Sequence, residues 1–394
     1  MKSRHLLMCL IFALTLSVWW QFYQLTFSRS RPKFVNVMEE SGSFLHQIKS
    51  IPKLTNFTRD NYSSGIEQDR EYYVNESIIG ISSKVQNIHE IAALLQKPWK
   101  LNTTKVSLLR EDIARSIRSE MILTKKYIRP FQKITYSLRK QTATISKKFH
   151  NTLPEVSPIQ RLHKRCSIVG NGGILSKSKC GNAIDRADFV IRCNAPPINE
   201  FREDAGVKSN ITTFNPSIII SRFGRLLKRN DQNSFIKSIN QYKNYIWFPS
   251  LSHPYPFFIC LKASELIHRQ SRIKVLNGNP DHFRQMSRYW KSNSNVNKTL
   301  SSGFYMILSA LTFCEEIHLY GFWPFYTDLH NRSLSYHYYE NLKLKIHAHD
   351  FDNEFKELLW LHSEDSRSRW TNINKLITRL VINQTSTQAT SSIL

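Results

Sequence analysis

Short apolar runs alternate with longer amphipathic segments from Pro154 onward. The apolar runs predict strands at Ser167–Val169, Phe189–Arg192, Ile211–Phe214, Tyr245–Phe248, Ile273–Leu276 and Ile317–Tyr320. The amphipathic segments predict helices at Asn233–Tyr242, Phe257–His268, Asp281–Trp290, Gly303–Cys314 and Asn353–His362. Alternation of this kind is typical of βαβ units. We therefore predict an α/β fold with a mostly parallel, Rossmann-like sheet.

The first predicted strand leads into a glycine-rich turn, Gly170-Asn171-Gly172-Gly173. Glycine permits a positive φ and lets the backbone approach a ligand closely. The spacing differs from the dinucleotide motif G-x-G-x-x-G. The turn therefore fits either the edge of a nucleotide site or a tight turn without a ligand.

Asparagines follow three of the predicted strands, at Asn171, Asn194 and Asn215. Ligands of parallel sheets bind beyond the carboxyl ends of the strands, so we expect Asn171 and Asn194 to share one crevice. A carboxamide offers a donor and an acceptor to a base, a ribose or a phosphate. Each asparagine also fits a helix cap or a turn.

A helix start with free hydroxyls occurs at Ser301-Ser302-Gly303, before an apolar run. Hydroxyls and unpaired backbone N–H groups at a helix start bind phosphate well. An ordinary N-cap is the alternative interpretation.

Histidines gather late in the chain, at His337, His347 and His349. The pair His347/His349 and the sequence Asp350-Phe351-Asp352 superficially suggest a metal site. We predict none, because Asp350–Asp352 opens an amphipathic helix, with Asp352 as its N-cap, instead of closing a strand. A histidine at a helix start suits a general base, because the positive helix end favours the neutral imidazole.

The segment Leu6–Tyr23 carries no charge, and as a helix it spans about 27 Å. The bulky residues that follow it favour an uncleaved membrane anchor over a cleaved signal peptide. Asn-x-Ser/Thr sequons then place the rest of the chain in the lumen. They lie at Asn56, Asn61, Asn75, Asn102, Asn210, Asn297, Asn331 and Asn383. The predicted layout is a cytoplasmic tail at 1–5, a signal-anchor at 6–23 and a lumenal stem with a basic collar at 24–150.

The formal net charge of +25 indicates anionic partners, and a lumenal location excludes nucleic acid. Lys and Arg side chains between Lys125 and Arg165 are opposed only by Glu155. This run fits a solvated face or a tether, or else a surface for polyanionic acceptors or lipid headgroups. A second basic stretch, Arg269–Lys298, fits a solvated helix face or a surface that holds a growing anionic chain.

Five cysteines lie in the predicted lumenal part, where disulfides are permitted: Cys166, Cys180, Cys193, Cys260 and Cys314. None of the spacings is C-x-x-C, which argues against structural zinc.

Four motifs in order resemble the animal sialyltransferases, and within them the α-2,8 branch, which includes oligo- and polysialyltransferases. The large motif is Cys166–Ser217, the small one Leu300–Phe325, the third His337–Glu340 and the last His349–Glu354. LPEVSP at Leu153–Pro158 is also similar to the α-2,8 branch. The resemblance implies a variant of the glycosyltransferase A-type fold in one catalytic domain at 151–380, followed by a polar tail at 381–394.

The resemblance also implies the roles of single residues. Asn171 and Asn194 match donor-binding asparagines, and Asn215 and Ser217 line the same site. Ser301, Ser302 and Gly303 match a phosphate cradle in which Ser302 replaces a threonine. Trp323 matches an aromatic residue at the nucleotide, His337 the third-motif histidine and His349 the catalytic base. Cys166 and Cys314 match a disulfide. The family's second bridge joins Cys180 to a late cysteine that this chain lacks, so Cys180 pairs with Cys260 or stays free.

The function implied is transfer of sialic acid from CMP-sialic acid to the 8-hydroxyl of a sialic acid on a glycoprotein or glycolipid. The expected reaction inverts the anomeric configuration and needs no metal or other cofactor. The expected location is the Golgi membrane, as a single-pass type II glycoprotein that forms homodimers. The alternatives are a non-catalytic sialoglycan-binding protein and a sialyltransferase of α-2,6 linkage.

Overall fold

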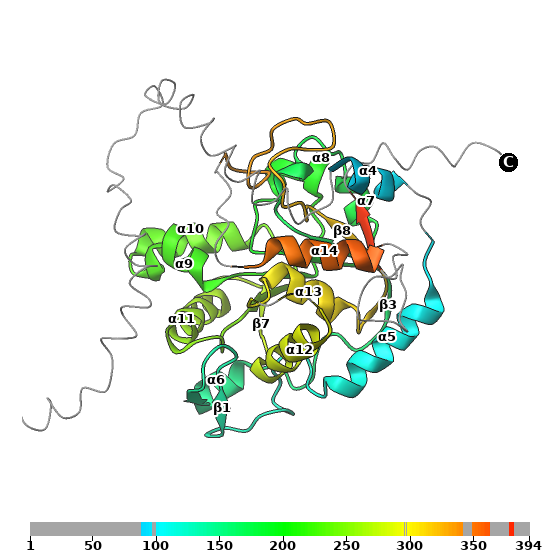
Figure 1. Ribbon diagram of the computed structural model, residues 1–394. Helices are drawn as coiled ribbons and strands as arrows, with labels where there is room; N and C mark the ends of the chain where they lie inside the picture. Colours follow the sequence, from blue (N-terminus) through cyan, green and yellow to red (C-terminus); the bar gives the residue numbers. More distant parts are fainter. Residues whose placement is uncertain are drawn as a thin grey trace, which may run out of the picture. The chain divides into compact units, whose positions relative to one another are not determined.

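The computed structural model describes residues 88–96, 100–294, 296, 298–341, 349–362 and 378–381, all within the unit Ser77–Leu394 (Figure 1). Several predictions lie outside these residues: the anchor at 6–23, His347, most of the tail at 381–394, and the sequons at Asn56, Asn61, Asn75, Asn297 and Asn383. Within the described ranges, no helix is both long and apolar enough to cross a membrane.

The centre of the described unit is a seven-stranded sheet with the strand order β7-β6-β5-β4-β3-β8-β9. Each neighbouring pair runs parallel. The strands are β3 (His163–Val169), β4 (Phe189–Arg192), β5 (Ile211–Thr213), β6 (Tyr245–Phe248), β7 (Lys274–Asn277), β8 (Cys314–Tyr320) and β9 (Thr378–Val381). The predicted α/β fold with a mostly parallel sheet is confirmed.

Helices cover both faces of the sheet. They are α4 (Ile88–Gln96), α5 (Thr103–Ser116), α6 (Lys147–Thr152), α7 (Gly181–Asp185), α8 (Arg202–Ala205), α9 (Pro216–Arg222), α10 (Arg229–Ile239), α11 (Pro254–Gln270), α12 (Pro280–Asn293), α13 (Ser302–Ala310) and α14 (Phe351–His362). Three short 3₁₀ turns add η1 (Gly173–Leu175), η2 (Asn199–Phe201) and η3 (Gly224–Leu226).

Side-chain alternation along the strands divides the core between the two faces. Ile168 and Ile191 pack on the face covered by α5, α12, α13 and α14. Val169 and Val190 point to the opposite face, toward α7 and α8, and farther along that face the sheet packs against α9, α10 and α11. Figure 1 shows α12, α13 and α14 together in front of the sheet.

Helix α5 belongs to the main core, because its Val106, Leu109 and Ile113 are buried there. The Arg110 guanidinium donates hydrogen bonds to the carbonyl oxygens of Leu311 and Cys314, at 3.1 and 2.6 Å. These contacts tie α5 to the start of β8. The helix lies in the segment 24–150 that the sequence assigns to the stem and collar.

An antiparallel hairpin that the sequence analysis did not predict lies beside α6. It consists of β1 (Lys133–Thr135) and β2 (Thr142–Thr144). With α6 it encloses a small separate core that includes Phe149 and packs onto Phe257 of α11.

Candidate active site

Two turns meet at the carboxyl ends of the adjacent strands β3 and β8. The Gly172 N–H donates to the carbonyl oxygen of Gly321 at 2.9 Å. A Cβ at Gly170 or Gly172 would lie 2.7 Å from that oxygen, and Gly321 itself has a φ of +72°. The glycines are therefore needed for close packing of backbone on backbone.

A chain of hydrogen bonds joins the ends of β4 and β5 to the start of α13. Asn194, at a φ of +62°, accepts the Asn215 N–H on its Oδ1 at 3.1 Å. Asn215 Oδ1 in turn accepts the Ser302 hydroxyl at 3.0 Å. Ser217 is exposed in the first turn of α9, and Asn171 follows the neighbouring strand β3. The buried Asn171 Oδ1 has no hydrogen-bond partner in the described part of the chain, so an acceptor is free there.

Helix α13 begins as the sequence predicts, with Ser301 as its N-cap. Its Oγ accepts the Phe304 N–H at 3.1 Å. The helix itself offers no acceptor to the N–H groups of Ser302 and Gly303. A Cβ at Gly303 would lie 2.9 Å from the Phe322 ring, so this helix start is tightly packed as well.

Helix α14 begins next to α13, and two hydrogen bonds join their starts. The Ser301 N–H donates to Glu354 Oε1 at 2.6 Å, and His349 Nδ1 donates to the Thr299 carbonyl at 3.0 Å. Because a carbonyl only accepts, Nδ1 carries the proton, and Nε2 of the neutral imidazole keeps its lone pair. Burial raises the pKa of Glu354 to about 7, although the hydrogen bonds from Ser301 oppose this.

The predicted N-cap of α14 was wrong. The helix begins at Phe351, and the Asp350 carbonyl accepts the Glu354 N–H at 2.8 Å, so Asp350 occupies the cap position. Asp352 lies inside the first turn, where a carboxylate also interacts favourably with the helix dipole. The residue types alone therefore could not show which of the two aspartates is the N-cap of α14.

His337 lies at the glycine turn, where its backbone bridges to Gly172. Its Nδ1 donates to the carboxylate of Glu340, and its ring stacks on Tyr336 and Tyr339 with centroids 4.1 and 5.1 Å away. Burial lowers the pKa of His337, while the Glu340 carboxylate raises it.

An arginine supports this histidine from α9. Arg222 lies 3.8 Å from the Glu340 carboxylate and over the ring of Tyr339. Its positive charge further lowers the pKa of His337.

Trp323 is buried beside α14. Its Nε1 donates to the Thr327 carbonyl at 2.7 Å, and its ring packs edge-on against Phe325 and Phe355. The side chain thus supports the helix that follows His349.

The described site groups converge at the carboxyl edge of β3, β4, β5 and β8. A model of the family described as glycosyltransferase family 29 (sialyltransferase) matches residues 112–366. The chain belongs to this sialyltransferase family.

Three curated relatives of this sialyltransferase chain are each called alpha-N-acetylneuraminide alpha-2,8-sialyltransferase. The Xenopus laevis protein is 41% identical over 225 residues, which cover 56% of this chain and 62% of the relative. The Xenopus tropicalis and Bos taurus proteins are 40% and 39% identical over 222 residues, covering 56% of this chain and 64% and 62% of the relatives. The chain thus spans slightly less than two thirds of the length of these relatives.

Two solved structures of mammalian sialyltransferases are also similar to this chain. One, in complex with Gal-beta-1-3GalNAc-ortho-nitrophenol, is 19% identical with a TM-score of 0.38, covering 74% of this chain and 90% of the other. The second is 17% identical with a TM-score of 0.37, covering 76% and 86%. The fold assignment of this sialyltransferase rests on its own sheet topology.

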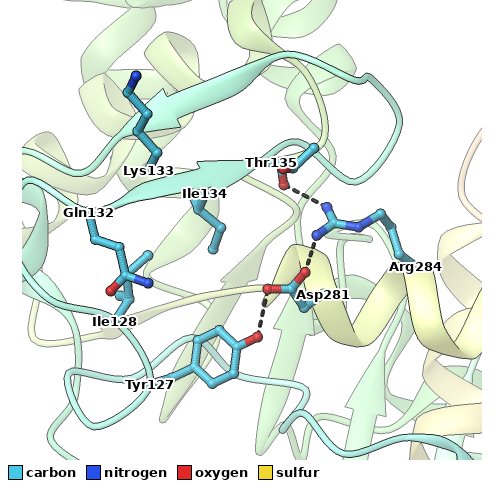
Figure 2. Close-up of a pocket in the computed structure, with 8 residues that line it drawn as sticks. All are labelled: Tyr127, Ile128, Gln132, Lys133, Ile134, Thr135, Asp281 and Arg284. Atoms are coloured by element: carbon cyan, nitrogen blue, oxygen red, sulfur yellow. Dashed lines mark hydrogen bonds and ion pairs between the residues drawn. The ribbon is translucent and has the colours of Figure 1, made fainter.

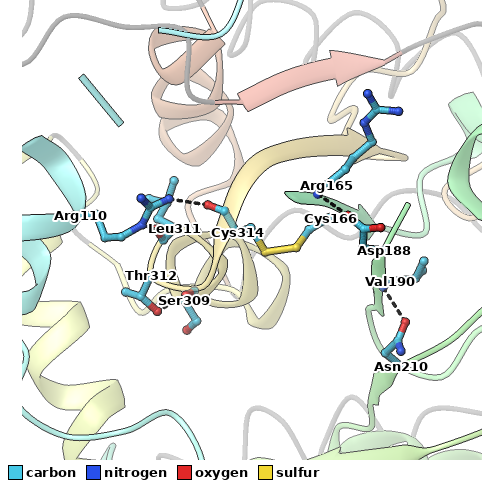
Figure 3. Close-up of a disulfide and its surroundings, with 10 residues drawn as sticks. All are labelled: Arg110, Arg165, Cys166, Asp188, Val190, Asn210, Ser309, Leu311, Thr312 and Cys314. Carbon is cyan, nitrogen blue, oxygen red and sulfur yellow. Dashed lines mark hydrogen bonds between the residues drawn. A yellow bond between two sulfur atoms is a disulfide. The ribbon is translucent and has the colours of Figure 1, made fainter. Parts of the chain in front are cut away.

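The disulfide that the resemblance implies joins Cys166 in β3 to Cys314 at the start of β8 (Figure 3). The two Cα atoms are 6.0 Å apart. Cys180, Cys193 and Cys260 are buried free thiols, so the alternative pairing of Cys180 with Cys260 is wrong. Cys180 precedes α7 and Cys260 lies within α11, helices that pack in different clusters of the core.

A pocket elsewhere in this sialyltransferase contains none of the predicted site residues (Figure 2). It has a volume of about 320 Å³ and lies between the hairpin and the start of α12. Its lining consists of Tyr127, Ile128, Gln132, Lys133, Ile134, Thr135, Asp281 and Arg284. Asp281 accepts the Tyr127 hydroxyl at 2.6 Å and pairs with Arg284, so these polar groups bind one another.

Three sequons lie within the described ranges. Asn102 caps α5, and Asn331 is exposed in a turn. Asn210 Oδ1 accepts the Val190 N–H at 2.9 Å, at the edge of β5. For the described residues, no group of three or more His, Cys, Asp or Glu side chains could hold a metal ion.

Sequence reasoning missed the parts played by Glu354, Arg222 and Glu340. Glu354 and Glu340 end motifs that were recognised, but their partners lie far away along the chain. Ser301 precedes Glu354 by 53 residues, and Arg222 precedes Glu340 by 118 residues. The available signal was a carboxylate a few residues after a histidine in each motif, and it does not indicate the distant partner.

Proposed function

We propose that this chain transfers sialic acid from CMP-sialic acid to the 8-hydroxyl of a terminal sialic acid on a glycoprotein or glycolipid. The observation that carries the proposal is the junction of α13 and α14. There, a histidine with a free Nε2 lone pair lies beside a helix start with unpaired N–H groups. A base and an anion site are thus held together by hydrogen bonds to backbone atoms.

In the proposed complex, the donor lies across the carboxyl edge of the sheet. The free Oδ1 of Asn171 and the amide of Asn194 bind the nucleotide sugar, with Asn215 and Ser217 lining the same site. The N–H groups of Ser302 and Gly303 and the Ser302 hydroxyl bind the phosphate. The N-cap Ser301 fixes that turn, and Trp323 packs at the nucleotide.

His349 Nε2 then takes the proton of the acceptor 8-hydroxyl as its oxygen attacks the anomeric carbon. The C–O bond to the phosphate of CMP breaks on the opposite side, so the configuration inverts. CMP leaves with the bonding electron pair. His337, protonated on both ring nitrogens with its Nδ1–H on Glu340, and the start of α13 stabilise the negative charge on the departing phosphate, so the reaction needs no metal ion.

The proposal includes the location and organisation of the whole protein. The chain is a single-pass type II protein of the Golgi membrane, with the anchor at 6–23, the stem from 24 and the catalytic domain to 380 in the lumen. It carries N-glycans and forms homodimers. The basic surface of the domain attracts an anionic donor and an anionic acceptor.

The test uses the full-length protein in detergent, with CMP-sialic acid and acceptors that end in sialic acid, in galactose or in N-acetylgalactosamine. We expect an α-2,8 linkage on the sialylated acceptors and equal rates with and without a chelator. Transfer to galactose or N-acetylgalactosamine alone would support the α-2,6 alternative. Glycan binding without transfer to any acceptor would support the sialoglycan-binding alternative.

The base is tested with His349→Ala. Loss of a general base lowers kcat by about 10²- to 10⁴-fold, whereas CMP affinity should stay within about twofold. His268→Ala, at an exposed position in the last turn of α11, is the matched control and should keep full activity. Full activity of His349→Ala would refute the assignment.

A further inference from the structure

The segment 121–153, called here the basic module, contains the hairpin β1–β2 and α6 and has no acidic residue. Its positive side chains are Lys125, Lys126, Arg129, Lys133, Arg139, Lys140, Lys147 and Lys148. All except Lys125 are exposed. Salt bridges join Lys125 to Glu155 and Lys148 to Glu265, which leaves most of the charge facing solvent.

Exposed aromatic side chains gather at the same place. Among the residues that the structure describes, the exposed aromatic side chains are Phe131, Phe258, Tyr255 and Tyr127, with 72%, 65%, 51% and 38% of their surface accessible. Two of them lie in the basic module and two in the first turns of α11. The rest of the described surface has no exposed aromatic side chain. An exposed apolar cluster of this kind often marks a binding surface.

Contacts within the protein hold these parts next to one another. The Phe131 N–H donates to the Ile145 carbonyl at 2.7 Å, immediately before α6. Phe149 of α6 packs on Phe257 at 5.2 Å, next to Phe258. At the hairpin turn, the Ser137 N–H donates to the Leu251 carbonyl at 2.9 Å, just before α11. Figure 1 shows α6 and β1 together at the lower edge of the view, below α11.

Phe131 is held in an unfavourable conformation. Its φ is +65°, which is uncommon for a bulky residue, and its ring points into solvent. The ring therefore adds nothing to the protein's own core that would offset the strain. Backbone strain of this kind clusters at functional sites, where the surrounding structure holds it in place.

We propose that the basic module and the first turns of α11 dock on the lumenal face of the membrane, on the anionic headgroups of sialylated glycolipids, with Phe131 and Phe258 entering the interface; the lumenal side rests on the proposed function. Lys and Arg side chains attract anionic headgroups, and aromatic rings settle at the level of the headgroups. An acidic protein segment would match the charge, but it would leave two exposed phenylalanine rings without an apolar environment. The charge and the rings together favour a lipid surface.

The test is hydrogen exchange of the full-length protein in nanodiscs of phosphatidylcholine, with or without about 30 mol% phosphatidylserine, a probe that supplies negative headgroups without being a sialylated acceptor. We expect amides in residues 126–148 and 255–262 to exchange about tenfold more slowly in the anionic nanodiscs. About 0.5 M salt should abolish this protection, because it screens the charges.

The variants separate charge from insertion. Each positive charge near an anionic surface strengthens binding about fivefold, so Lys126→Gln with Lys140→Gln weakens docking about 25-fold and removes the protection. Phe131→Gly should also remove it while raising the thermal stability, because glycine accepts a positive φ without strain. A Phe131→Gly protein that unfolds earlier and keeps its protection would overturn the proposed role of the ring.

Matched controls lie away from this surface. Leu227→Ser removes a side chain that is 68% exposed, and Lys237→Gln removes an exposed charge on α10. Both should leave the protection unchanged. Equal exchange in neutral and anionic nanodiscs would overturn the proposal. Protection by soluble polyglutamate but not by nanodiscs would also overturn it, and would assign the surface to an acidic protein segment.

Discussion

Glu354 makes the stability of the protein depend on pH in a direction that can be worked out from its surroundings. The side chain is 4% exposed, and burial raises its pKa from 4.5 to about 7. Below pH 4.5 the carboxyl is protonated in both the folded and the unfolded protein. Between pH 4.5 and about pH 7, Glu354 loses its proton in the unfolded chain but keeps it in the folded protein. The free energy of unfolding therefore falls as pH rises from 4.5 through about 7.

The size of this effect follows from the same two values. A difference from 4.5 to about 7 lowers the free energy of unfolding by about 3 kcal/mol once the pH exceeds both. Glu354→Gln keeps an oxygen that can accept the Ser301 N–H and removes the buried charge. For a domain of this size the variant should melt about 6 °C above the wild type at pH 8 and nearly with it at pH 4.5.

The assay is thermal unfolding of the full-length protein from pH 4.5 to pH 8, followed by tryptophan fluorescence. Glu120→Gln removes an exposed negative charge outside α13 and α14, and it reports any general effect of net charge. If the difference in melting temperature between the wild type and Glu354→Gln stays the same from pH 4.5 to pH 8, the reasoning is refuted. A Glu354→Gln protein that melts below the wild type at pH 8 would refute it too.

Three further predictions concern the framework of the site. Arg222→Gln removes a charge that lowers the pKa of His337, so the limb of the kcat profile that reports loss of the His337 proton should move to higher pH; an unchanged profile would separate Arg222 from His337. Cys166→Ser opens the bridge to Cys314, and chemical denaturation should show a loss of about 2–4 kcal/mol, a value that a reduced wild type should match. Gly172→Ala places a Cβ 2.7 Å from a backbone carbonyl, and the same assay should show a loss of about 1–3 kcal/mol, whereas no loss would mean that the two turns can separate freely.

Strands of the central sheet could be predicted from the sequence because a buried strand is a short run of apolar residues. Phe189–Arg192 and Tyr245–Phe248 were predicted with their observed bounds, since both are short runs of apolar residues between polar turns. The short strands of the hairpin were missed. Lys133–Thr135 and Thr142–Thr144 bury one residue each, so their pattern resembles that of a loop.

The helix ends and the partners of the site residues were harder to predict. The predicted helix Gly303–Cys314 stops at Ala310, and the turn Leu311–Phe313 then leads into β8 at Cys314. Neither hydropathy nor spacing indicates such a change from helix to strand inside one apolar run. In the same way, the sequence placed Asn194 and Asn215 at strand ends, but only the observed strand order makes β4 and β5 neighbours.

Some contacts across the site are made to backbone groups and others join two side chains, and the two types predict different effects on kcat and KM. The Ser301 N–H bonds Glu354 of α14, 53 residues away along the chain, and the Thr299 carbonyl bonds His349, 50 residues away and just before α14. Ser302 meets Asn215 through two side chains. The backbone groups remain when the side chain of Ser301 or Thr299 is changed, so the base and the helix start keep their relative position in such variants, but not when Glu354 is changed. The contact between Ser302 and Asn215 is lost with either side chain. Variation at Asn215 should therefore change the KM for the donor more than kcat, whereas variation at Glu354 should change both.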